Sequence, residues 1–258
     1  MKLLAKKLFN SNFLIFLRNN FNIKKIKFNL YNIKQSASVS DSFCWRTDNK
    51  FETIFKFSDI LSNFYKINNS KIKINLYSKS GKIINEFALN DLKSSNNIFK
   101  INKTLLNGLE DYGTFHVYHK LNHDIDDKII ISNRCYIGYS KENSLPSYMH
   151  GNTYSSYENI FKGINKYSNI TLNKVITDSI YKIQNYFEGY DKTEFFFSNP
   201  TNKKIKFFLN NEFYELETNS SMLIKSMKEK TFTIKSNCLF LRPIVFNYRN
   251  DFLDVFHA

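Results

Sequence analysis

Glycine, proline and cysteine are scarce in this chain, which has 7 glycines, 3 prolines and 3 cysteines among its 258 residues. So little glycine and proline excludes collagen-like and Pro-rich architectures and any glycine-dense nucleotide loop. The cysteines, Cys44, Cys135 and Cys238, are too few and too far apart for a disulfide framework or a zinc site. We therefore expect free thiols, no cofactor and a reducing, cytoplasmic location.

The motifs of several common enzyme classes are missing as well. No Gly-x-Ser-x-Gly elbow, Gly-x-x-x-x-Gly-Lys phosphate loop, Gly-x-Gly-x-x-Gly fingerprint or His-Glu-x-x-His pair occurs in the chain. The sequence therefore favours a non-enzymatic protein, although a catalytic site assembled from distant residues stays open.

Acidic residues are outnumbered, since 37 Lys and Arg face 23 Asp and Glu, for a net charge of +14. Nucleic-acid recognition favours arginine for its bidentate fork, and only five of these cations are arginines. The abundant Lys, Asn, Ile, Phe and Tyr are typical of an AT-rich coding sequence. We therefore do not expect nucleic acid as a partner.

Residues 1–40 contain no Asp or Glu but eight Lys or Arg. Their apolar run Phe13–Leu17 is far shorter than the roughly 20 residues that cross a bilayer. Three interpretations stay open. The segment forms a basic amphipathic helix over Leu3–Phe21 on an anionic membrane surface, is an organellar transit peptide, or is a disordered or docked leader.

From residue 50 onward, apolar and polar residues alternate with a period of two, which predicts β-strands. Phe51, Phe55 and Phe57 lie on one face of the first strand. A second strand begins at Lys71, and Gly81 predicts a hairpin between it and the apolar segment that starts at Ile83. Further strands are expected at Ile98–Ile101, Thr114–Leu121 and Ile129–Tyr139.

The second half of the chain repeats similar segments in the same order. Thr193–Ser198 is similar to Thr53–Ser58, and Lys204–Phe207 is similar to Lys71–Ile74. Chance alignment in a chain so rich in Phe, Ile and Lys is the alternative explanation. We interpret the pattern as a tandem duplication in which the smaller second unit leans on the first unit or on the linker.

Between the two halves, Lys174–Glu188 has apolar residues at helical spacing and is followed by Gly189, which predicts one helix. The expected fold is therefore all-β, with two immunoglobulin-like antiparallel β-sandwiches joined by a loop and one α-helix. The predicted parts are a basic leader, a first sandwich, a junction loop with a helix, and a smaller second sandwich, at residues 1–40, 41–143, 144–189 and 190–258.

The five histidines do not predict a metal site. His116 and His119 are three positions apart on a predicted strand, so they point to opposite faces and do not share one ion. His123 precedes Asp124, but the calcium-loop pattern of glycine and a distal glutamate is absent. We expect no bound metal.

The segment from Leu145 to Tyr154 is unusual because it combines proline, histidine, glycine, asparagine and tyrosine. Loops between rigid domains often carry ligand sites. Tyr148 offers a ring for stacking, and His150 and Asn152 offer polar groups. We interpret the segment first as a turn that locks the domain junction, and a ligand site is the alternative.

A second candidate set consists of Trp45 and Arg46, ahead of the first strand, and Arg134 and Arg242, at similar points of the two predicted repeats. Such arginines either clamp an anionic ligand or form structural ion pairs that fasten the domains. We interpret them first as structural.

These observations favour a non-enzymatic β-sandwich protein that binds a glycan or another protein. One alternative is an enzyme acting on a sugar or anionic substrate at the junction, with His150 as base and Tyr148, Asn152, Arg134 or Arg46 holding the substrate. Another is a peripheral membrane protein that uses residues 1–34. The ligand and the oligomeric state stay open.

Overall fold

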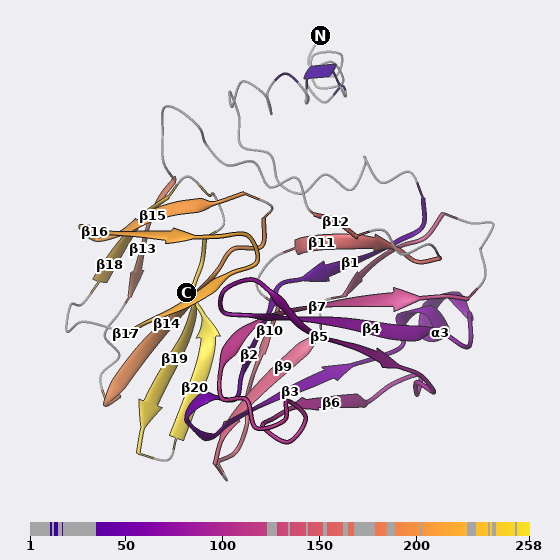
Figure 1. Cartoon of the computed structure of the whole chain (residues 1–258), viewed down its shortest axis with the longest axis horizontal. Coiled ribbons are helices and arrows are strands. Elements are labelled where there is room, and N and C mark those ends of the chain that lie inside the picture. Colours follow the sequence, from indigo (N-terminus) through magenta and orange to yellow (C-terminus); the bar gives the residue numbers. More distant parts are fainter. Residues whose placement is uncertain are drawn as a thin grey trace.

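The described part of the chain forms five four-stranded β-sheets, so the expected all-β fold is confirmed (Figure 1). The computed structural model describes residues 11, 13–14, 17, 35–122, 128–133, 135–142, 144–151, 154–161, 165–167, 179–184, 189–201, 203–225, 231–236, 238, 241–250 and 252–258. Nearly all strand pairs are antiparallel.

Two sheets of the first half pack face to face. One has the order β2-β7-β4-β5, with strands Phe43–Arg46, Tyr112–Lys120, Lys71–Ser78 and Ile83–Leu89. The other has the order β10-β9-β3-β6, with strands Ser147–His150, Tyr136–Lys141, Phe51–Phe57 and Asn97–Ile101. The rings of Phe43, Phe55 and Phe115 meet between them, with centroids 5.1 to 5.4 Å apart. The first half is therefore a sandwich with an aromatic core.

The second half also has two sheets packed around a core. One has the order β13-β18-β15-β16, with strands Ser179–Gln184, Thr231–Ser236, Ile205–Leu209 and Glu212–Leu216. The other has the order β17-β14-β19-β20, with strands Ser221–Lys225, Lys192–Ser198, Ile244–Arg249 and Phe252–His257. The ring of Phe195 lies 5.3 Å from that of Phe232, and the ring of Phe197 lies 4.8 Å from that of Phe207.

A fifth sheet lies against β7 in the first half. Its order is β12-β11-β1-β8, with strands Asn165–Tyr167, Tyr154–Asn159, Ala37–Asp41 and Ile130–Asn133, and its β1–β8 pair is parallel. The hydroxyls of Ser38 and Ser40 accept hydrogen bonds from the backbone N–H groups of His119 and Val117 in β7. Strand β1 therefore includes the end of the predicted leader, whereas most of residues 1–34 lie outside the described residues.

The two sandwiches share one strand order when the strands of the fifth sheet, β1, β8, β11 and β12, are set aside. The first half is then counted from β2 and the second half from β13. In the sheets β2-β7-β4-β5 and β13-β18-β15-β16, the first strand pairs with the sixth, the sixth with the third, and the third with the fourth. In the other sheet, the eighth pairs with the seventh, the seventh with the second, and the second with the fifth. The strands that correspond are therefore β3 and β14, β9 and β19, and β10 and β20.

The predicted alternation is confirmed in strand β3, where Phe51, Phe55 and Phe57 are buried. The β4–β5 hairpin is also confirmed, and Gly81 adopts a φ of 83°, which favours glycine. A short helix, α3 (Ile60–Tyr65), and a 3₁₀ turn at Asp48–Lys50 were not predicted. Within the described ranges, no helix is long and apolar enough to cross a bilayer.

Two predicted elements are wrong. The single strand expected at Ile129–Tyr139 is two strands, β8 and β9, which belong to different sheets. The helix expected at Lys174–Glu188 is strand β13 over Ser179–Gln184, and its other residues lie outside the described ranges. Six cross-strand pairs with β18 hold β13 in the extended conformation. The helix was predicted partly because Ile180 was counted on its apolar face, but the Ile180 side chain is exposed.

The halves share part of one hydrophobic core. Phe195 and Phe197 point into the second sandwich, whereas Phe196 and Phe246 from the same sheet pack in the core cluster of the first sandwich. The sheet β17-β14-β19-β20 is therefore covered on both faces, which explains its uninterrupted Phe-Phe-Phe run. The second half thus rests on the first.

Candidate functional site

Trp45 and Arg46, two of the predicted site residues, are fully buried. The ring N–H of Trp45 donates a 2.8 Å hydrogen bond to the carbonyl oxygen of Tyr77. Both side chains therefore bond inside the protein and present no surface to a ligand.

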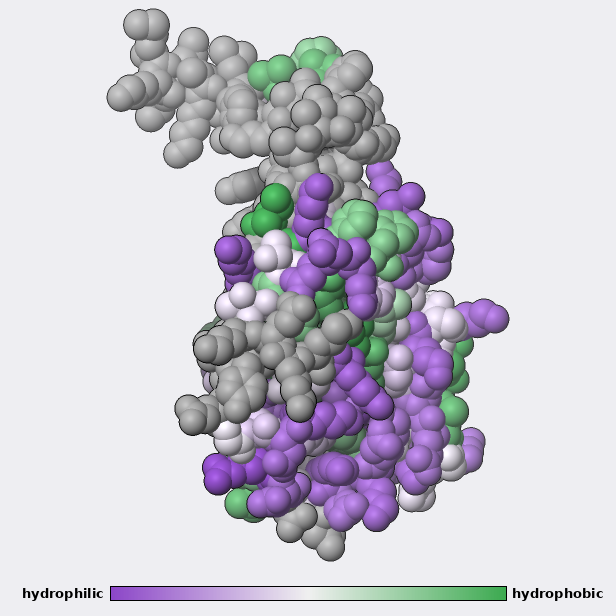
Figure 2. Space-filling view, turned by 90° about the vertical axis from the view of Figure 1, so that its left-hand side faces the viewer, coloured by the Kyte–Doolittle hydropathy of each residue, from purple (hydrophilic) through white to green (hydrophobic). Residues whose placement is uncertain are grey.

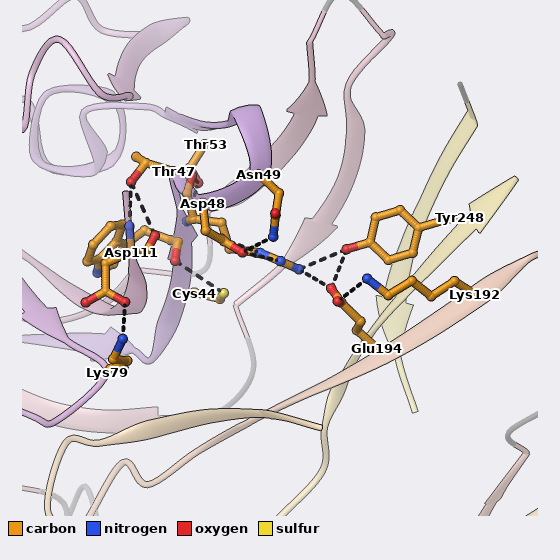
Figure 3. A network of polar contacts seen from close by, with 12 residues as sticks. Cys44, Thr47, Asp48, Asn49, Thr53, Lys79, Asp111, Lys192, Glu194 and Tyr248 are labelled. Atoms are coloured by element: carbon orange, nitrogen blue, oxygen red, sulfur yellow. Dashed lines mark hydrogen bonds and ion pairs between the residues drawn. The ribbon is translucent and has the colours of Figure 1, made fainter. Parts of the chain in front are cut away.

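Arg46 lies at the centre of an ion-pair network between the two halves. Its partners Asp48, Glu194 and Tyr248 are labelled in Figure 3. Its Nε and Nη2 donate to the two carboxylate oxygens of Asp48 at 2.9 and 2.7 Å, and its Nη1 donates to Glu194 at 2.9 Å. The guanidinium carbon also lies 4.2 Å from the ring centre of Phe51 and 4.8 Å from that of Phe246. The observed contacts are those of a structural ion pair.

The Glu194 carboxylate interacts with three donor groups, from Arg46, Lys192 and Tyr248. Lys192 approaches it at 2.6 Å, and the Tyr248 hydroxyl donates to it at 2.5 Å. Burial raises the pKa of Glu194, but the charge of Arg46 and the hydrogen bonds of Lys192, Tyr248 and Arg46 outweigh it and lower the pKa to about 2. Glu194 is therefore ionised at neutral pH and fastens β14 to β2.

Of the other predicted arginines, the structure describes Arg242. The Arg242 side chain donates from Nε to the carbonyl oxygen of Ala258 at 2.9 Å. Arg134 and Asn152 lie outside the described residues.

Tyr148 and His150 lie together on the outward side of the sheet β10-β9-β3-β6. Cross-strand register places His150, Tyr136, Lys56 and Ile98 in one row across four strands. The adjacent row contains Tyr148 and Ile54, with Gly138 between them. We call this surface the tyrosine face and define it by Ile54, Lys56, Ile98, Tyr136, Tyr148 and His150.

The two tyrosines of this face are accessible to solvent. Tyr136 is 55% exposed and Tyr148 is 37% exposed. A Cβ atom added to Gly138 would lie 2.5 to 2.9 Å from three ring atoms of Tyr148, so this ring covers the glycine. The Tyr136 ring lies 4.5 Å from the His150 ring, and the Lys56 ammonium lies 4.4 Å from the Tyr148 ring centre. The face thus offers two aromatic rings and a cation on a rigid sheet.

The His150 imidazole has no hydrogen-bond partner among the residues that the structure describes, although its backbone oxygen lies 3.1 Å from His257 Nε2. A catalytic base needs a group that orients its ring. Within the described residues, the ring of His150 contacts that of Tyr136, which makes it part of the tyrosine face.

A second concave surface lies beside this face, between the β9–β10 and β19–β20 turns. Its apolar part has a volume of about 830 Å³ and is lined by Leu145, Pro146 and Phe252 among others. A smaller adjoining part of about 280 Å³ includes Lys141 and Tyr248. We call this groove the junction cleft, since each half contributes one of its two turns.

Other titratable or nucleophilic side chains are buried. Burial lowers the pKa of His116 to about 3, so this imidazole is neutral, and its Nδ1 lies 3.4 Å from the Ser156 hydroxyl. Burial also raises the pKa of Cys135 to about 12, which keeps the thiol protonated. No group of three or more His, Cys, Asp or Glu side chains within the described ranges is arranged to hold a metal ion.

Sequence reasoning missed Tyr136, Lys56 and Ile98. Period-two alternation in strand β3 places Lys56 opposite the buried phenylalanines, which was the available signal. Its neighbours across the sheet depend on the register between distant strands, which alternation does not specify.

No protein-family model matches the chain, and no curated protein or solved structure matches it.

Proposed function

We propose that this protein is a non-enzymatic binding protein that recognises a glycan through the tyrosine face. The observation that carries the proposal is the pair of exposed rings, Tyr136 and Tyr148, side by side on the uncovered side of a sheet. An aromatic ring gives an apolar surface for the C–H face of a sugar, and the phenol hydroxyl gives a hydrogen-bond partner. The sheet holds both rings in place without a cost in backbone ordering.

The outward side of the corresponding sheet in the second half, β17-β14-β19-β20, differs from the tyrosine face, and this difference supports the proposal. There Phe196 and Phe246 cover the sheet, and both are buried against the first half. The tyrosine face carries Lys56 and Tyr136 on the corresponding strands and lies open. A surface that is half polar suits reversible binding better than permanent packing.

The test is a glycan array followed by calorimetric titration of the best ligand. Tyr136→Ala and Tyr148→Ala are each expected to lower the affinity about tenfold, because each removes one stacking surface near the centre of the site. The melting temperature should change little, since both side chains are on the surface.

Phe213→Ala is the matched control, because Phe213 is 51% exposed on β16, on the outer side of another sheet. The side of the molecule formed by the second half is mostly hydrophilic, with separate hydrophobic patches (Figure 2). Phe213→Ala should leave the affinity unchanged. A folded protein that binds no glycan, or tyrosine variants that bind as the wild type does, would refute the proposal.

Gly138→Ala tests the geometry of the face without removing an aromatic ring. The new methyl group would lie 2.5 Å from the Tyr148 ring, so the ring must lift off the sheet. We expect the affinity to fall about as far as in Tyr148→Ala, while the free energy of unfolding changes by less than about 1 kcal/mol. Unchanged affinity in titration would show that the position of the Tyr148 ring does not matter.

A protein ligand in the junction cleft is the second candidate function. Leu145 is 89% exposed and Phe252 is 60% exposed, and both line its apolar part. Such neighbouring apolar side chains are typical of contact surfaces. This candidate would be favoured by a protein partner whose binding is lost in Leu145→Asp and kept in Tyr136→Ala.

We also propose that the two sandwiches arose by tandem duplication, because their strand orders correspond. An immunoglobulin-like relationship is supported by the central pairings of the second strand with the fifth and the third with the sixth. The first strand, however, pairs with the sixth here, so the relationship concerns the central strands and not the edges.

We propose a cytoplasmic location because Cys44 and Cys135 are free, buried thiols. The membrane-surface alternative depends on residues 1–34, which lie mostly outside the described residues. Salt-sensitive binding to anionic liposomes that is lost on deleting these residues would support that alternative.

A further inference from the structure

Lys56 differs from the other cations around the tyrosine face. Its ammonium has no carboxylate within ion-pair distance in the described part of the chain, and its observed contact is the Tyr148 ring. Lys100 at the edge of the sheet is paired with Glu52 at 3.1 Å, and Asn102 also donates to that carboxylate. Lys56 is therefore an uncompensated positive charge in the middle of an aromatic surface.

The position of this charge suits a substituent on a stacked sugar. Register places Lys56 directly between Tyr136 and Ile98, and its ammonium lies 4.4 Å from the Tyr148 ring centre. A ligand that covers the rings therefore brings its edge groups to the ammonium. The carboxylate of Glu52, on the same face of β3, is already engaged by Lys100 and Asn102.

We infer that the ligand of the tyrosine face is an acidic glycan, with a carboxylate or sulfate group bound by Lys56. This inference rests on the proposed function and adds the chemical class of the ligand. Lysine is a compact point charge without a planar fork, so it pairs with a carboxylate and with a sulfate. The net charge of +14 attracts such polyanions over longer distances.

The experiment measures dissociation constants by calorimetry at one fixed salt concentration for three probes. These are oligogalacturonate for a carboxylate, chondroitin sulfate oligosaccharides for both anionic groups, and neutral cello-oligosaccharides. The wild-type protein should bind at least one acidic probe about tenfold or more tightly than the neutral one. Lys56→Gln should remove this preference, whereas Lys56→Arg should keep it.

Lys182→Gln is the matched control, because Lys182 is an exposed lysine on β13 in the second sandwich. It removes the same charge from another surface, so it measures the general attraction of a basic protein for polyanions. The inference is overturned if Lys56→Gln keeps the acidic preference, or if Lys182→Gln lowers it equally.

The outcomes also separate this inference from the proposed function. If neutral and acidic glycans bind equally and Tyr136→Ala weakens both, the glycan function stands and the acidic ligand is wrong. If no probe and no arrayed glycan binds the folded wild-type protein, the proposed function itself fails.

Discussion

Arg46→Met is expected to lower the free energy of unfolding by about 3–5 kcal/mol, the usual cost of removing one partner from a buried ion pair. Methionine roughly fills the space of the side chain, but Asp48 and Glu194 lose their guanidinium. Of these, Glu194 is the more deeply buried and keeps Lys192 and Tyr248 as its remaining donors. Urea unfolding monitored by circular dichroism gives the free energy directly.

Lys50→Met is the control for this prediction. Lys50 and Glu142 form an ion pair of similar length, 2.9 Å, but both side chains are more than half exposed. Such pairs contribute about 0 to 1 kcal/mol, so the control should unfold nearly as the wild type does. Equal stability of Arg46→Met and Lys50→Met would show that the buried network does not hold the halves together.

The pH dependence of the stability difference between the wild type and Arg46→Met provides a second check. The pKa of Glu194 is lowered from 4.5 to about 2 in the folded protein, so its contribution is complete above pH 4.5 and is lost as the pH falls through 2. Without Arg46 this contribution is smaller, because only Lys192 and Tyr248 still stabilise the ionised Glu194. The stability difference between wild type and Arg46→Met should therefore be constant from pH 7 to pH 5 and shrink below it.

The elements that could be predicted from the sequence are those that local alternation defines. Strand β3 and the β4–β5 hairpin have a regular period of two and a turn glycine, and both are confirmed. The break between β8 and β9 has no such local mark, because the chain leaves one sheet for another there. In β13, pairing with β18 overrides a spacing that fits a helix equally well.

The residues of the candidate site also fall into those that the sequence predicts and those that only the fold brings together. Tyr148 and His150 stand out in the sequence because their segment has an unusual composition. Tyr136 and Lys56 become their neighbours only through register, and Lys56 lies more than 80 positions from Tyr148 along the chain. Arg46 fits the structural ion pair that we first expected, but its partner Glu194 is 148 positions away. Side-chain type can therefore suggest a role, while the partner comes from the fold.

Phe196→Ala is expected to lower the free energy of unfolding by about 3–5 kcal/mol, as for other large aromatic side chains removed from a core. Phe196 belongs to the second half, but it packs in the core cluster of the first half, where its ring lies 6.1 Å from that of Tyr112. The one tryptophan of the chain, Trp45, is buried in that same cluster. Its fluorescence therefore reports on the first half.

If the halves unfold as one unit, Phe196→Ala should shift the Trp45 fluorescence transition and the circular dichroism transition by the same amount. The exposed-ring variant Phe213→Ala should shift neither by more than about 0.5 kcal/mol. A Trp45 transition that stays at its wild-type midpoint in Phe196→Ala would mean that the first sandwich does not need the second. The tyrosine face, which lies entirely on the first sandwich, could then be studied in that sandwich alone.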